Sequence, residues 1–187
     1  LPDFTGRALA AIRLINPVRT SVQQMSMLGK GWLGSERNFN RPVSIELVVS
    51  PHYRIYWTGD YYDKLITFLK EGKSYYHTYL GSAFALTVPK FIGEYKAVEL
   101  DKEQVVECST VVPLSAVRKL IPKPGSQYGR ISGMHCEYFG SRRFGMTTNV
   151  LYEMSGQTIS LIPQVNNDEK CSYRFVQTDA GEVLCLW

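Results

Sequence analysis

The sequence predicts an α+β fold, and three observations point to that class. β-Rich runs recur along the chain, one segment near residue 65 carries apolar residues at helical spacing, and turn residues separate the runs of the last third. The 187 residues, of which 44% are apolar and 20% charged, are enough for one large domain or two small ones.

The first quarter predicts a strand followed by a protrusion. An apolar run at 8–16 ends at the turn signal Asn16-Pro17. The next segment, about 18–42, is polar, basic and glycine-bearing, and its large apolar residues follow no core period. Because so long an insertion in a compact domain is usually functional, we predict a protruding β-hairpin or loop.

One interrupted strand and one helix are predicted next. Runs at 42–50 and 53–59 are split by Pro51, which cannot donate to a strand ladder, and predict a single bent strand. Asp60 is predicted to cap a helix that Gly72 ends. The apolar stripe of this helix, which must cover a sheet, comprises Tyr62, Leu65, Ile66 and Leu69.

The remainder of the chain is predicted to be β-rich. The expected strands are 90–100, 104–114, 147–153, 157–163, 171–178 and 182–187. Hairpin-type turns are expected at Ser155-Gly156, Asn166-Asn167 and 179–181.

The order strand, protrusion, strand, helix, strand predicts most of a ferredoxin-like unit whose first strand and helix are absent from this chain. We therefore expect a ferredoxin-like domain at 1–107 with its N-terminal part missing, and a β-rich C-terminal segment at 108–187.

The charge distribution indicates a polyanionic partner. The net charge is +4, and the segment 7–41 contains six basic residues against Glu36 alone. Nucleic acid is the simplest such partner.

Composition also limits the class of protein. No apolar run approaches the roughly 18 residues of a membrane helix, and no secretory leader opens the chain, so we expect a cytoplasmic protein without a membrane contact. The four cysteines form no CxxC pair and the three histidines share no ligand spacing, so we expect free thiols, no metal and no cofactor.

Residue types in the protrusion suit single-stranded nucleic acid. Cations that could follow phosphates are Arg19, Lys30, Arg37 and Arg41, and side chains that could stack on bases or wedge between them are Met25, Met27, Trp32 and Phe39. A second basic spot is Arg142-Arg143. The alternative is a solvated loop whose Trp32 folds back onto the core.

No motif for catalysis by a serine nucleophile, a zinc-bound water or a phosphate-binding loop is present. The enzymatic alternative is a metal-independent ribonuclease in which a side chain at the helix exit acts as general acid or base. Its candidate residues are Lys73, Tyr76 and His77.

Several stretches resemble the Cas-five subunit family of type I CRISPR Cascade complexes, most closely its I-B branch. They are "RLINPVRT", "YRIYWTG", "YLGSAFALTVPKFIGEY", "VVPLSAV" and "RRFGMTTNVLYE", and the resemblance covers most of the chain from Ile12 onward. It implies a ferredoxin-like, RAMP-type domain whose β-hairpin thumb grips the 5′ handle of the crRNA. The implied partners are the large subunit, a Cas-seven backbone subunit and, through the complex, target DNA.

Transferred to this sequence, the thumb would span about Arg19 to Arg41, with Gln23 among its contacts, and the glycine turn would approach the handle. That turn comprises Tyr79, Leu80, Gly81 and Ser82. Some relatives carry a cation directly after the glycine, where this chain has Ser82, so backbone or hydroxyl contacts are expected there. The I-B branch leaves RNA cleavage to a Cas-six nuclease, which disfavours the ribonuclease alternative. A third alternative is a structural adaptor with little RNA contact.

Overall fold

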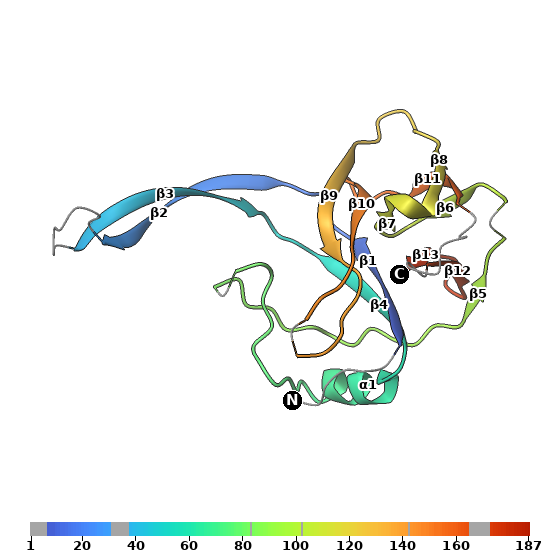
Figure 1. The fold of residues 1–187 in the computed structure, drawn as a ribbon, viewed down its shortest axis with the longest axis horizontal. Helices are drawn as coiled ribbons and strands as arrows, with labels where there is room; N and C mark the ends of the chain where they lie inside the picture. The colour runs from blue at the N-terminus through green and yellow to red at the C-terminus, as the bar shows by residue number, and fades with distance from the viewer. Residues whose placement is uncertain (1–6, 31–37, 83, 102, 142, 165–172) are drawn as a thin grey trace.

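The computed structural model describes residues 7–30, 38–82, 84–101, 103–141, 143–164 and 173–187. In these ranges the protein is mostly β, with one α-helix and a mixed sheet (Figure 1). The coarse α+β prediction is therefore confirmed.

In the part of the chain that the structure describes, thirteen strands make up four sheets. The strands are β1 (Ala8–Leu14), β2 (Thr20–Lys30), β3 (Asn38–Val48), β4 (Tyr53–Gly59), β5 (Ala97–Glu99), β6 (Val106–Cys108), β7 (Val112–Pro113), β8 (Val117–Leu120), β9 (Tyr128–His135), β10 (Thr147–Glu153), β11 (Ile159–Pro163), β12 (Arg174–Thr178) and β13 (Val183–Leu186). The helix α1 is Tyr62–Lys70, and a 3-10 turn covers Leu114–Ala116. The sheets have the orders β1-β4, β2-β3, β7-β10-β9 and β5-β12-β13-β6-β11-β8, and within them only β13 and β6 are parallel.

The main core lies between the six-stranded sheet and the three-stranded sheet. Phe175 and Leu161 from the first pack with Val112 from the second, and all three are fully buried. Two free thiols, Cys108 and Cys185, belong to this core, and burial raises the pKa of both. These thiols therefore remain protonated and serve as small apolar side chains.

The β1–β4 pair packs against the C-terminal sheet by one of its faces. Ala11 of β1 and Tyr56 of β4 contact Val176, Leu184 and Leu186. The free edge of β1 also forms backbone hydrogen bonds with Trp187, 3.1 Å from Ala10 N to Trp187 O and 3.0 Å from Trp187 N to Ala10 O. The strand is thereby bound on both of its edges.

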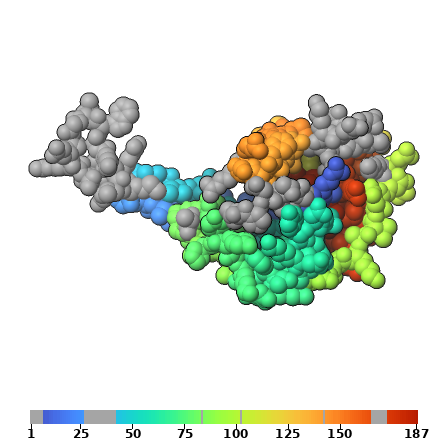
Figure 2. Space-filling view, turned by 60° about the horizontal axis from the view of Figure 1, so that its bottom comes forward, coloured from blue at the N-terminus to red at the C-terminus, as the bar shows by residue number. Residues whose placement is uncertain are grey.

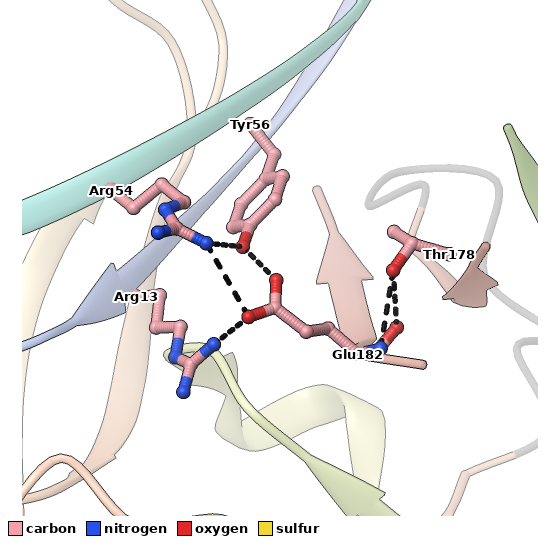
Figure 3. Close-up of polar contacts among 5 residues, drawn as sticks. All are labelled: Arg13, Arg54, Tyr56, Thr178 and Glu182. Carbon is pink, nitrogen blue, oxygen red and sulfur yellow. Dashed lines mark hydrogen bonds and ion pairs between the residues drawn. The ribbon is translucent and has the colours of Figure 1, made fainter. Parts of the chain in front are cut away.

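A cluster of polar side chains also holds the β1–β4 pair against the C-terminal sheet (Figure 3). The Glu182 carboxylate forms an ion pair with Arg13 and accepts a hydrogen bond from the hydroxyl of Tyr56, and Arg54 lies 3.5 Å from it. Glu182 precedes β13, and its N–H donates to Thr178 Oγ1 at 3.1 Å. The hydrogen bond to Tyr56 also raises the pKa of Arg54, so its guanidinium stays charged.

The helix differs from its prediction at one end. It begins after Tyr61, which has φ 65°, and the Asp60 carboxylate instead accepts the Arg7 N–H at 2.8 Å; the prediction that Asp60 caps the helix is wrong. Gly72, with φ 64°, ends the helix as predicted, and the hydrogen bond from Lys73 N to Phe68 O, 2.8 Å long, closes the last turn. No residue of this helix is buried. In its apolar stripe, Leu65, Ile66 and Leu69 are half-buried and Tyr62 is exposed.

The protrusion is an antiparallel hairpin that extends further than predicted. β2 pairs with β3 from Thr20↔Val48 to Lys30↔Asn38, so the hairpin reaches residue 48 rather than 42. The segments 42–50 and 53–59 are consequently not one bent strand. The first belongs to the hairpin, because Val43 and Ile45 continue the pairing of β3, while β4 pairs with β1.

Some later strands also differ from expectation. The segments 90–100 and 104–114 contain only the short strands β5, β6 and β7, and the strands β8 and β9 were not predicted. Ser155-Gly156 joins β10 to β11, which lie in different sheets, so it is no hairpin turn. The turn at 179–181 does join paired strands, β12 and β13, whereas Asn166-Asn167 lies outside the described residues. The boundary predicted at 107/108 falls within β6.

The Glu182 cluster makes a prediction about stability. Replacing Glu182 by alanine should lower the free energy of unfolding by about 2 to 4 kcal/mol, because Arg13 and Tyr56 lose their partner in a site where Glu182 is only 18% exposed. Urea denaturation measures the change. Glu107→Ala is the matched control: it breaks the more exposed pair with Lys123 and should cost less than about 1 kcal/mol. Equal costs for the two variants would contradict the role given to Glu182.

Candidate nucleic-acid interface

The β2–β3 hairpin is the feature that projects furthest from the body (Figure 1, Figure 2). Each strand has 11 residues, which corresponds to an arm about 34 Å long. Side chains on its described part are exposed or half-buried, and Val22 is 66% exposed. Because an isolated two-stranded hairpin is only marginally stable in water, contact with a partner would stabilise such an arm.

The root of the hairpin is firmly held. Val18 N donates to Met154 O at 2.7 Å, and Val49 N donates to Arg19 O at 2.8 Å. The side-chain amide of Asn16 donates to Ser50 O at 3.0 Å. The first bond ties the root to the end of β10, and the other two hold the two flanks of the hairpin together, with the exposed Arg19 side chain at its base.

The predicted contact residues of the arm are distributed along its length. Gln23 is exposed on β2 and its side chain donates to Ser21 Oγ at 2.8 Å, and Met25 is half-buried opposite Val43. By strand position, Lys30 ends β2 and Arg41 pairs with Met27 on β3. Trp32 and Arg37 lie outside the described residues.

The glycine turn predicted at 79–82 is present. Tyr79 and Leu86 form an isolated bridge, and Leu80 N donates to Ala85 O at 2.9 Å while Ala85 N donates to Ser82 O at 2.8 Å. Gly81 has φ 77°, a conformation that favours glycine. Tyr79 and Leu80 are exposed, and in both overall views the segment between α1 and β5 reaches the root of the hairpin (Figure 1, Figure 2).

The helix exit shows no assembled catalytic group. Lys73 Nζ lies 2.7 Å from the Glu71 carboxylate, and Tyr76 and His77 are exposed. Within the described ranges no hydrogen bond links Lys73, Tyr76 and His77 to one another. No group of three or more acidic, histidine or cysteine side chains there could hold a metal ion.

The β9–β10 loop adds aromatic side chains that were not among the predicted contact residues. Tyr138, Phe139 and Phe144 are exposed on it. Arg143 is exposed beside them, and its N–H donates to Gly140 O at 2.9 Å; Arg142 lies outside the described residues. The signal in the sequence is the run "EYFGSRRFGM", in which aromatic residues flank the basic pair.

Comparison of the chain with protein-family models, curated proteins and solved structures gives no match. In the described part of the chain, no helix has the length and apolar character needed to span a membrane.

The glycine turn yields a prediction with a matched control. Both Gly81 and Gly125 have positive φ, 77° and 81°, and an added Cβ at either position meets no atom within 4 Å. Each change to alanine should therefore cost about 1 kcal/mol of stability through backbone strain alone. If the turn approaches RNA, only Gly81→Ala should also weaken binding of single-stranded RNA, measured by fluorescence anisotropy. The same affinity in both variants would remove the turn from the interface.

Proposed function

We propose that this chain is the subunit that binds the 5′ handle of crRNA in a cytoplasmic type I CRISPR Cascade complex of the I-B kind. In this role it has no catalytic activity of its own. It takes part in RNA-guided recognition of target DNA by holding one end of the guide, and it meets DNA only through the complex.

The main structural support for the proposal is the projecting β2–β3 hairpin. The described residues of β2 and β3 do not contribute to the cores formed by the sheets, yet the arm is held at its root, where Val18 packs against a core and its N–H donates to Met154 O. Cations occur at its base and, by strand position, towards its far end, namely Arg19, Lys30 and Arg41. Such an arm can lie along a single strand and contact successive phosphates.

Phosphate contacts would position the RNA, and exposed side chains would select its shape. Single-stranded RNA is recognised through unstacked bases that stack on aromatic or flat side chains. Tyr79, Tyr138 and Phe144 are exposed rings of this kind. The glycine turn would contribute backbone N–H groups, because Ser82 stands where a cation would be needed for a charge contact.

The ferredoxin-like, RAMP-type interpretation of the fold is part of the same proposal. Its support is the chain order β1, hairpin, β4 and α1, with β1 antiparallel to β4. The order matches the second half of a ferredoxin-like unit that carries an insertion between two strands.

Exposed apolar side chains support a place in a protein assembly. The segment after α1 exposes Tyr75, Phe84, Leu86, Val88 and Ile92. Apolar groups gathered in this way are typical of protein contact surfaces. We assign this surface to the large subunit and the Cas-seven backbone subunit, whereas no observation specifically favours the ribonuclease alternative.

Reversing charge on the arm tests the proposal. With about four cations on phosphates, the slope of log K against log salt for single-stranded RNA should be near −3. The triple change of Arg19, Arg37 and Arg41 to glutamate should weaken handle binding at least tenfold and flatten the slope to about −1.

The matched control changes Arg118, Lys119 and Arg174, which are exposed on the six-stranded sheet, to glutamate. This variant has the same net charge as the first, so it should bind RNA more tightly than the hairpin variant at every salt concentration. Equal affinities would show a non-specific charge effect, and unchanged binding in the hairpin variant would favour the adaptor alternative.

A further inference from the structure

A cavity of about 300 Å³ lies between β1 and the β9–β10 loop. Ala10 and Ile12 of β1 line one side, the segment 134–138 and Phe144 line the other, and Trp187 completes the wall. Its volume is at the lower end of the range for small-molecule sites, which suits one planar ring system.

The outer wall of the cavity is aromatic. His135 stacks on Phe144 with ring centroids 4.9 Å apart and an interplanar angle of 28°, and Tyr138 lies 5.3 Å from Phe144. Phe144 is nevertheless 53% exposed, so a large part of its ring remains uncovered. An uncovered ring at the edge of a cavity offers a stacking surface to a flat ligand.

One polar group in the wall has hydrogen-bonding capacity open to a ligand. The Glu137 carboxylate accepts the Met146 N–H at 2.9 Å through Oε2, and its other oxygen accepts no hydrogen bond from the described part of the chain. The wall thus offers one acceptor to a ligand.

We propose that this cavity binds one unpaired nucleobase that carries an amino group. The inference rests on the RNA-binding function proposed above and adds to it a single-base site away from the hairpin. The base stacks on Phe144, and its amino group donates to Glu137. The exposed Arg143 lies on the same loop, where it can contact the adjoining phosphate.

An RNA base fits the wall better than an apolar side chain of a protein partner. An apolar occupant would cover a Glu137 oxygen without giving it a donor, and burying an unpaired carboxylate oxygen is costly. A base that carries an amino group satisfies this oxygen through its edge while its faces meet the rings.

The same chemistry predicts a preference between pyrimidines of equal size. Cytosine presents an N4 amino group where uracil presents the O4 carbonyl oxygen. A carboxylate accepts a hydrogen bond from the first and repels the second. We therefore expect the site to prefer cytidine to uridine.

The test measures binding of the full chain to labelled oligocytidine and oligouridine of equal length by fluorescence anisotropy. The wild-type chain should bind oligocytidine more tightly. Phe144→Ala should weaken binding about fivefold or more, as loss of one stacked base does. Phe139→Ala is the control, because Phe139 is a similarly exposed ring, at 59%, on the same loop but outside the cavity wall, and it should change affinity less than twofold.

A conservative variant tests the polar contact. Glu137→Gln should reduce the preference for oligocytidine over oligouridine towards 1, because an amide can donate to O4 as well as accept from N4. Thermal melting of each variant verifies that the chain remains folded.

The outcomes separate this inference from the function on which it rests. If the hairpin reversal weakens binding but Phe144→Ala behaves like Phe139→Ala, the base site is overturned and the proposed function stands. If Phe144→Ala impairs assembly with protein subunits but leaves RNA affinity unchanged, the occupant of the cavity is a side chain of a protein partner and the base site is overturned. An unchanged pyrimidine preference in Glu137→Gln overturns the amino-group contact, and absence of RNA binding by the wild-type chain overturns both proposals.

Discussion

The Glu182 carboxylate holds the β1–β4 pair against the C-terminal sheet, and the position of each surface described above depends on that contact. β1 continues through residues 15–19 into the hairpin, so the angle at which the arm leaves the body follows from how β1 is seated. β1 also forms one wall of the cavity beside the β9–β10 loop. An ion pair and a hydrogen bond are directional, so together with the backbone hydrogen bonds between Ala10 and Trp187 they fix one seating of β1 where apolar contacts alone would allow several.

Local chemistry explains which elements the sequence predicted. The Gly72 helix end, the Gly81 turn and the 179–181 hairpin each need a backbone conformation that favours glycine, and a single residue reveals it. An apolar run before the Asn16-Pro17 turn signal likewise predicted β1, and β-rich composition predicted β10. Strand partners depend on contacts between distant segments, which explains why residues 42–59 were predicted as one strand although they divide between the hairpin and the β1–β4 pair.

The candidate site was predictable in part for the same reason. The hairpin is indicated by the sequence alone, because cations and aromatic residues occur together within one insertion. The cavity could not be predicted in this way, because Ile12, Phe144 and Trp187 are far apart in the sequence and meet only through the packing of β1. If both surfaces bind one RNA, the arm supplies affinity through charge and the cavity supplies selectivity through one base.

Ultraviolet crosslinking of the full chain to crRNA, with mass spectrometry of the crosslinked peptides, tests the central claim most directly, because it reports which residues lie against the bases. The account predicts crosslinks in the hairpin, 20–48, and in the β9–β10 loop, 134–146. Crosslinks confined to the six-stranded sheet, for example to β8 or β12, would contradict it.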